Sequence, residues 1–345
     1  MKKNILQVEK DVLRNYQKSN PSFIKLNKNS FKNHKSRRKS LFQYKLNFPI
    51  KLFKNSHVLD LGSGTGEQDL CYASWGADLT LVEINSVSVQ QTKKYFTDFN
   101  YASKIKEIHN CSIFDFKPKK SYDIVISEGV FHHTENPKKC FDILIENLKD
   151  DGFVILQLAF DSSLLQRSLQ RMIMNYLTDG DYDKIITYSP KLFSETLERA
   201  SKFGGRSFKQ IIHDFYTNPK HKGIGYLEIM NWFKDNNIKF YSAYPSINPE
   251  NLINGVHLKG GAELLNEYPH ISAFANIYFI MASSEDQDFI GDFYENAIYT
   301  NKKMQSLMDE SGLNDYVYGT QRDIKHLTES FKDYFSSVHN LFKVR

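Results

Sequence analysis

The chain has 345 residues, of which 41% are hydrophobic and 25% are charged, and its formal net charge is +5. This composition is typical of a globular protein and leaves room for one large domain or two ordinary ones. No run reaches the roughly 18 to 20 apolar residues of a membrane span, and residues 1–25 lack the apolar core of a signal peptide. Three widely spaced cysteines without a C-x-x-C pair indicate neither a disulfide framework nor a metal site, so we expect a cytoplasmic protein.

Residues 1–56 are expected to form a basic helical segment. They hold 15 Lys and Arg, and their only acidic residues are Glu9 and Asp11. A basic leader of this kind can contact nucleic acid or an acidic substrate. The more ordinary interpretation is a solvated helical face, because runs of charge are usually solvated.

Strands and helices alternate from residue 57 to about residue 160. The expected strands are His57–Leu61, Leu79–Ile84, Ile105–His109, Tyr122–Ser127 and Gly152–Ala159, with helical patterns over Ser88–Phe99 and Lys138–Asn147. This repetition indicates βαβ units and a parallel sheet with helices on both faces. Two later candidates, Lys239–Tyr244 and Ala273–Ala282, extend the prediction to a doubly wound α/β fold with seven strands.

A helical cap is expected between the fifth and sixth strands, over residues 161–237. Apolar residues recur there at steps of three and four, which predicts an amphipathic helix: Leu164, Leu165, Leu169, Met172, Ile173, Tyr176 and Leu177. The last strands would then lie within residues 238–284. A helical appendage is expected over residues 285–345, where an apolar stripe from Ile324 to Leu341 predicts a packing face or, alternatively, a homodimer contact.

The motif Val58–Gly66 is the most informative part of the chain. An apolar run ends in Asp60, and three glycines follow at alternate positions. A strand that enters a tight loop and a helix presents backbone N–H groups to a ligand. The dinucleotide fingerprint needs its third glycine where Glu67 stands, and no Gly-Lys-Ser/Thr phosphate loop is present. Because an acid beside the loop would repel a polyphosphate, a small cofactor with an amine and a carboxylate fits better.

Glu83 ends the second expected strand, 23 residues after Asp60. A carboxylate there can accept both hydroxyls of a ribose, as the acid about 20 positions past the glycine loop does in nucleoside-binding sheets. An ordinary solvated acid at a strand end is the alternative. Because a glycine loop precedes Glu83 at this spacing, we favour the ribose role.

Four ordered blocks resemble the class I S-adenosylmethionine-dependent methyltransferases. They are Val58–Gly66, Leu81–Glu83, Ser112–Phe116 and Tyr122–His133, and Lys149–Phe153 fills the place of the family's turn before strand five. Each block alone is weak, but together and in order they are specific. The resemblance covers residues 58–159 and implies a Rossmann-like fold, S-adenosylmethionine as the cofactor and methyl transfer by in-line displacement.

The resemblance also implies roles for individual residues. The methionyl part of the cofactor would lie at Asp60, Gly62, Ser63, Gly64, Thr65 and Gly66, and the ribose at Glu83 and Ile84. Ser112 and Ile113 would flank the adenine, with the Ser112 hydroxyl as an acceptor. Ser127, Glu128 and Gly129 would lie near the sulfonium methyl, at the end of strand four.

Several residues could serve as a base for an acceptor that carries a proton. His132 and His133 follow strand four and Glu128 precedes them, although a histidine in such a turn also commonly packs or caps the next helix. In the cap, His213, Tyr216 and His221 lie in a polar, aromatic stretch. That stretch predicts either a substrate lid or a loop braced by aromatic residues.

We expect a methyltransferase that acts on a small molecule, because the cap could enclose one. The alternative enzyme is an RNA or tRNA methyltransferase that uses the basic leader, although no aromatic RNA-binding motif is present. A non-catalytic protein that binds S-adenosylmethionine is a third hypothesis. No membrane partner is expected.

Overall fold

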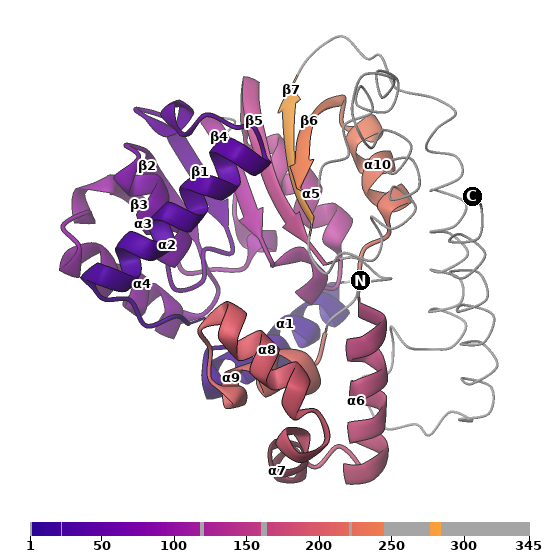
Figure 1. The fold of residues 1–345 in the computed structure, drawn as a ribbon. Coiled ribbons are helices and arrows are strands. Elements are labelled where there is room, and N and C mark those ends of the chain that lie inside the picture. Colours follow the sequence, from indigo (N-terminus) through magenta and orange to yellow (C-terminus); the bar gives the residue numbers. More distant parts are fainter. Residues whose placement is uncertain are drawn as a thin grey trace, which may run out of the picture.

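The computed structural model describes residues 2–21, 23–117, 121–159, 164–220, 223–244 and 277–283. Its centre is a sheet in the order β3-β2-β1-β4-β5-β7-β6 (Figure 1). The strands are β1 (His57–Leu61), β2 (Asp78–Val82), β3 (Ile105–His109), β4 (Tyr122–Glu128), β5 (Leu148–Leu158), β6 (Ile238–Tyr244) and β7 (Ile277–Ser283). Strands β1 to β5 are parallel, whereas β7 runs antiparallel to β5 and β6. The expected α/β fold with a mostly parallel sheet is confirmed.

Helices cover both faces of the sheet, because successive side chains of a strand point to opposite sides. On one face, Leu59 and Leu61 pack with residues of α5 (Pro137–Glu146) and α10 (Tyr226–Asp235). On the other face, Val58 packs with α2 (Lys28–Ser40), α3 (Glu67–Ser74) and α4 (Ser86–Asp98). Asp60 shares the side of Val58, so it faces the layer that contains α3.

The basic leader is anchored in the core. Phe42, in the π-helical turn Leu41–Lys45, and Phe53, in the 3-10 turn Ile50–Phe53, pack on the rings of Tyr72 and Trp75. Helix α2 buries one phenylalanine, one histidine and Arg38. The helix has the expected solvated face, with Lys32 and Lys39 exposed, and its opposite face is a buried contact surface.

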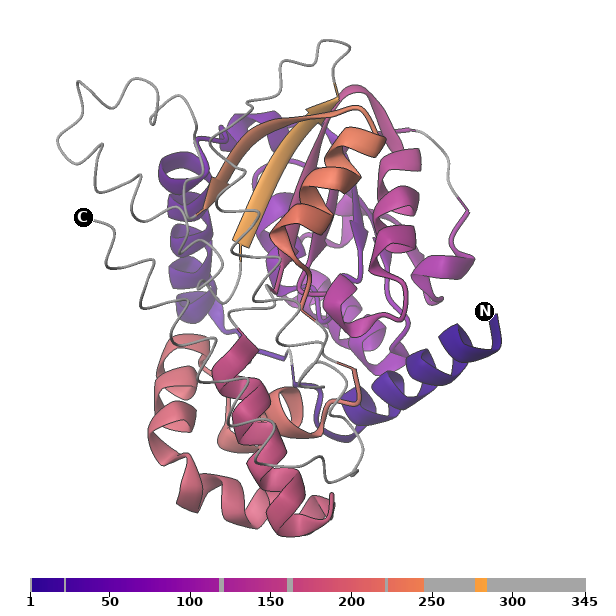
Figure 2. The same ribbon diagram turned by 90° about the vertical axis from the view of Figure 1, so that its right-hand side faces the viewer.

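The cap follows β5 and lies beyond the carboxyl edge of the parallel strands, on the same side as α1 (Lys2–Ser19) (Figure 2). It consists of α6 (Leu165–Thr178), α7 (Tyr182–Leu192), α8 (Ser194–Gly204), α9 (Phe208–Ile212) and the π-helical turn His213–Thr217. It has a hydrophobic cluster of its own, which includes Met174, Ile185, Leu197 and Ile211. Helix α10 packs on the sheet instead. We therefore propose that the cap ends before α10 and not at residue 237.

Helix α6 is present as expected, but it buries its polar face. Gln170 and Arg171 are buried, whereas Ile173, Tyr176 and Leu177 are 40%, 51% and 49% exposed. The buried polar face lines a second cavity of about 560 Å³ that α6 shares with α1 and the turn after His213. The predicted helix is present, but three residues of the predicted apolar stripe are exposed, and polar residues share its buried side.

Three short 3-10 turns complete the described elements: Ala102–Lys104, Ile113–Asp115 and Phe131–His133. The predicted appendage over residues 285–345, with its apolar stripe and homodimer contact, lies outside the described residues, and so does His221. Within the part of the chain that the structure describes, no helix is both long and apolar enough to cross a membrane.

Candidate active site

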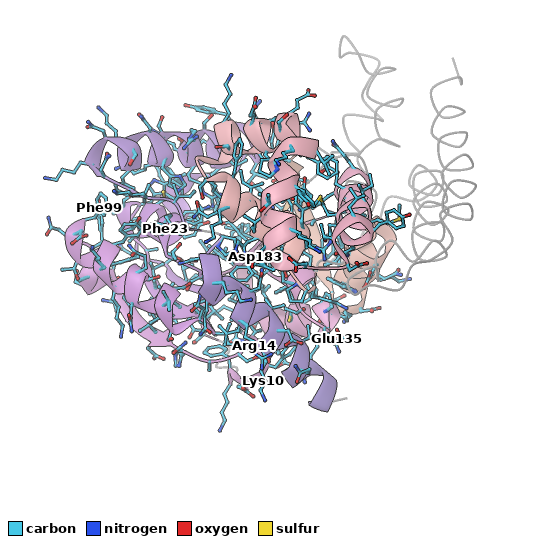
Figure 3. All side chains as sticks on the ribbon, turned by 90° about the horizontal axis from the view of Figure 1, so that it is seen from below. Lys10, Arg14, Phe23, Phe99, Glu135 and Asp183 are labelled. Atoms are coloured by element: carbon cyan, nitrogen blue, oxygen red, sulfur yellow. The ribbon has the colours of Figure 1, made fainter. Side chains whose placement is uncertain are left out.

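A cavity of about 240 Å³ lies at the carboxyl ends of β1, β2 and β4. Its inner wall consists of residues from these strand ends, and α1 closes it from outside with Glu9, Leu13 and Tyr16. Figure 3 views this side of the molecule from below, where Lys10 and Arg14 mark α1. The first helix of the basic leader is therefore part of the site's wall.

Most of the predicted cofactor residues line this cavity. They are Asp60, Gly62, Ser63, Gly64, Thr65, Glu83, Ile84, Ile113, Glu128 and Gly129. Three others lie behind the wall. Gly66 begins α3, Ser127 donates its hydroxyl to the Leu61 carbonyl oxygen at 2.8 Å, and Ser112 bonds to Glu9.

The glycine loop needs backbone conformations that other residues rarely adopt. Gly62 has a φ of +89° and Gly66 a φ of +81°. A β-carbon on Gly62 would lie 2.5 Å from a Val130 methyl carbon, and one on Gly66 would lie 2.7 Å from the Thr92 methyl carbon. The loop thus fits tightly between its neighbours, and only glycines let its backbone approach a ligand there.

Glu83 is oriented at the end of β2 by two backbone groups. The Gly64 N–H donates to Oε2 at 2.9 Å and the Asn85 N–H donates to Oε1 at 2.7 Å. Burial raises the pKa of Glu83, and these N–H groups oppose the shift. Each carboxylate oxygen can accept more than one hydrogen bond. Glu83 can therefore still accept hydrogen bonds from hydroxyl groups of a ligand in the cavity.

Asp60 and Asp69 form a buried pair of carboxyl groups between β1 and α3. Asp60 is 4% exposed and Asp69 is fully buried. Across the described chain, no donor from outside the pair reaches Asp60 Oδ1 or either oxygen of Asp69, so the hydrogen bond available to these oxygens is the one between the two carboxyl groups. Burial raises the pKa of Asp69 to about 7; a hydrogen bond with Asp60 opposes this shift, and the charge of Glu128 adds to it. Burial, and then the charge of Asp69, raises the pKa of Asp60 well above its ordinary range. The pair therefore retains a proton near neutral pH.

Replacing Asp69 with asparagine is expected to change how stability depends on pH. The pKa of Asp69 is about 7 when folded and 3.8 ordinarily, so the folded chain binds an extra proton between these values. Its contribution to the free energy of unfolding is present below the ordinary pKa and is lost as the pH rises toward 7. The stability of the wild type relative to Asp69→Asn should fall by about 2 kcal/mol between about pH 5 and 6.5. Urea unfolding at several pH values measures this difference.

Asp78→Asn is the matched control for this experiment. Slight burial raises the pKa of Asp78, but the hydrogen bond and charge of Lys104 outweigh it and lower the pKa. The contribution of Asp78 is therefore lost as the pH falls, which is the opposite direction. A stability difference between wild type and Asp69→Asn that stays constant with pH would show that Asp69 holds no such proton.

Glu128, at the end of β4, is bound on both carboxylate oxygens. Arg38 donates from Nη1 to Oε2 at 2.9 Å and from Nη2 to Oε1 at 2.6 Å, and the Tyr72 hydroxyl also donates to Oε1. The side chains of Arg38 and Glu128 are only 6% and 9% exposed. Both carboxylate oxygens of Glu128 are thus already engaged by donors from within the fold. We therefore infer that Glu128 shapes the cavity wall and does not receive a proton.

His133 lines the cavity, and its contacts fix the position of its proton. Nδ1 lies 2.8 Å from the Lys220 carbonyl oxygen. Asn218 Nδ2 is 3.1 Å from the same nitrogen, but the shorter contact is to an atom that can only accept, so Nδ1 carries the hydrogen. Nε2 is then the basic nitrogen of the neutral ring. Burial lowers the pKa of His133, and the charge of Asp214 opposes the shift.

His132 lies beside His133, with ring centroids 4.2 Å apart, but it is buried and does not line the cavity. Burial, and then the neighbouring His133, lowers the pKa of His132 well below its ordinary range. It therefore fits the packing role that the sequence analysis gave as the alternative to catalysis.

The structure does not bring His213 and Tyr216 into this cavity. His213 is fully buried, contacts the Tyr182 hydroxyl and lies 3.3 Å from Asn15 of α1, and burial lowers its pKa to about 4. Tyr216 is also buried and donates to Gln170 Oε1 at 2.9 Å. These side chains hold the cap together and attach it to α1, so we withdraw them as candidates for contact with the acceptor.

A parallel sheet with a glycine loop, an acid at the end of the next strand and a cavity at the carboxyl edge defines a nucleoside-binding α/β protein. Residues 33–215 match the model of the family described as methyltransferase domain. The chain belongs to this family, whose cofactor is S-adenosylmethionine.

Two known proteins illustrate the relationship. Over 118 residues the chain is 27% identical to the mitochondrial ubiquinone biosynthesis O-methyltransferase of Schizosaccharomyces pombe, a match that covers 34% of this chain and 42% of that protein. The chain thus spans less than half the length of this curated relative. The structure of PKMT2 from Rickettsia typhi covers 89% of this chain and 72% of its own, with a TM-score of 0.51 and 13% identity. Its complex with AdoHcy gives a TM-score of 0.52, covers 76% of this chain and 55% of its own, and is also 13% identical. At this identity, the likeness shows the fold alone.

Proposed function

We propose that the protein is an S-adenosylmethionine-dependent methyltransferase whose acceptor is a small molecule bound beside His133. The buried Asp60 carboxyl in the cavity wall, whose Oδ1 receives no hydrogen bond from outside the Asp60–Asp69 pair in the described chain, supports this most. An ammonium group supplies both the missing donor and the charge that favours ionisation of the buried pair. Five acids line the cavity together with the glycine loop, which suits a cationic ligand better than a pyrophosphate: Glu9, Asp60, Glu67, Glu83 and Glu128.

Each part of the site has its own role in this proposal. Asp60 and the loop hold the amino-acid part of the cofactor, and Glu83 accepts the ribose hydroxyls. When bound, S-adenosylmethionine supplies a methyl group on a sulfonium. His133 Nε2 accepts the proton that the acceptor loses as its new bond to carbon forms. α1 keeps water from the reacting atoms and restricts the acceptor's orientation, and the cap supports α1 through the contact between His213 and Asn15.

A small acceptor is favoured because α1 lies across the cavity and lines it with Glu9, Leu13 and Tyr16. Arg38 of the basic leader also forms a buried ion pair with Glu128 and does not lie on the surface. The cytoplasmic compartment and a homodimer through the C-terminal segment remain predictions from the sequence.

Titration calorimetry with S-adenosylmethionine, S-adenosylhomocysteine and NAD tests the proposal. We expect the two sulfur compounds to bind and NAD not to bind, since the acidic cavity disfavours a pyrophosphate. The protein should then transfer label from methyl-labelled S-adenosylmethionine to the small-molecule filtrate of a cell extract. Protein and RNA fractions of the same extract serve as parallel acceptors.

Two results would count against the proposal. Binding of NAD without binding of either sulfur compound would overturn the cofactor assignment. Label that enters only the RNA or only the protein fraction would overturn the small-molecule acceptor and leave the methyltransferase activity in place.

A further inference from the structure

We propose that Glu9 of α1 recognises the adenine of the cofactor by accepting a hydrogen bond from its exocyclic amino group. This inference rests on the proposed function and assigns a specificity residue to it. Glu9 lies outside every methyltransferase motif of the chain, 103 residues before the position where it meets the core.

The contacts of Ser112 show which group presents an acceptor to the cavity. The Ser112 hydroxyl donates to Glu9 Oε1 and accepts the Phe114 N–H at 3.1 Å. Ser112 itself does not line the cavity, whereas Glu9 does, next to Cys111 and Ile113. The predicted acceptor role of Ser112 therefore passes to the carboxylate that Ser112 orients.

The order of the strands places a base beside Glu9. β3 is the edge strand next to β2, and β1 and β4 lie on the other side of β2. With the ribose at Glu83 and the reacting end near Gly129 and His133, the base must extend away from β4. It then lies over the residues that follow β3, where Glu9 closes the cavity.

The electrostatic environment of Glu9 favours an amino group as its ligand. Burial raises the pKa of Glu9, the hydrogen bond from Ser112 opposes the shift, and the charge of Asp115 adds to it. Among the described residues, the Ser112 hydroxyl is the side-chain donor to this carboxylate, and an exocyclic amine provides a further donor. A hypoxanthine base would turn a carbonyl oxygen toward the same carboxylate, which is repulsive.

An alternative is that Glu9 only fastens α1 to the core through Ser112. In that case, loss of Glu9 would weaken the binding of adenine and hypoxanthine nucleosides equally. The ratio of the two affinities separates the two roles, because a purely structural contact cannot sense the substituent on the base.

The test measures the affinities of S-adenosylhomocysteine and S-inosylhomocysteine by calorimetry, for the wild type and for Glu9→Gln. We expect the wild type to prefer the adenine compound by about 10-fold to 100-fold, as for a hydrogen bond to a charged group. In Glu9→Gln the preference should fall to less than about 3-fold, because the amide can rotate to donate to the carbonyl oxygen. Ser112→Ala, which removes only the orienting hydroxyl, should lower the preference to an intermediate value.

Asp11→Asn is the matched control, since Asp11 lies on the same helix but lines the second cavity. It should keep the wild-type preference. An adenine preference that is unchanged in Glu9→Gln, with S-adenosylhomocysteine still bound, would overturn the role of Glu9 alone. If the wild type bound neither nucleoside, the proposed function would fail, and this assignment with it.

Discussion

Replacing Arg38 with alanine is expected to destabilise the folded protein by about 3 to 5 kcal/mol, the usual cost of removing one partner from a buried ion pair. Both terminal guanidinium nitrogens of Arg38 reach the Glu128 carboxylate, at 2.9 and 2.6 Å, and both side chains are nearly inaccessible. In the described part of the chain, the variant leaves the Tyr72 hydroxyl as the remaining side-chain donor to the buried Glu128, in place of a full positive charge. Denaturant unfolding of the apo protein at neutral pH measures the loss.

Arg37→Ala is the matched control, because Arg37 is the neighbouring residue on α2 and is exposed. Its effect should stay within about 0.5 kcal/mol, as for most surface substitutions. The double variant Arg38→Ala/Glu128→Ala should be more stable than the sum of the single effects, because it also removes the stranded charge. Equal effects of Arg38→Ala and Arg37→Ala would contradict the buried pair.

The sequence predicted the sheet well, because its strands carry the signals that sequence analysis can detect. β1 and β3 begin and end where the sequence placed them, since apolar runs bounded by turn residues mark buried parallel strands. α6 shows the limit of the same method. Its periodicity is real, but which face is buried depends on a polar cavity shared with α1, and periodicity carries no information about such a neighbour.

The candidate site also contains some residues that the sequence could identify and others that it could not. Asp60, the glycine loop and Glu83 follow a spacing that the sheet topology dictates, so the sequence was enough to select them. Arg38 reaches Glu128 across 90 positions and Glu9 reaches Ser112 across 103. No local pattern distinguishes these two residues from the other charges of the leader. His213 failed as a candidate for a related reason, because a polar side chain in a cap can serve the cap's own core.

His133 carries the largest expected effect on activity. Its conversion to asparagine is expected to slow methyl transfer by about 10²-fold to 10⁴-fold, the usual contribution of a general base. An asparagine can still donate an N–H toward the Lys220 carbonyl oxygen, as Nδ1 does, but it has no counterpart of the basic Nε2. The loss should therefore appear in the rate with saturating cofactor, while affinity for S-adenosylhomocysteine remains close to that of the wild type.

The pH dependence of the rate distinguishes a base from a residue that only packs. Because burial holds the pKa of His133 below its ordinary value of 6.5, wild-type activity should be constant near neutral pH and fall only at lower pH. His133→Asn should lose most of the activity and also the decrease in activity at low pH. The control His57→Asn, at an exposed residue, should keep both. The assay follows label from methyl-labelled S-adenosylmethionine into the extract fraction that the wild type methylates. If His133→Asn kept the wild-type rate and its decrease at low pH, Nε2 would not be the group that receives the proton. The methyl acceptor would then have to lose its proton to water or need no base at all.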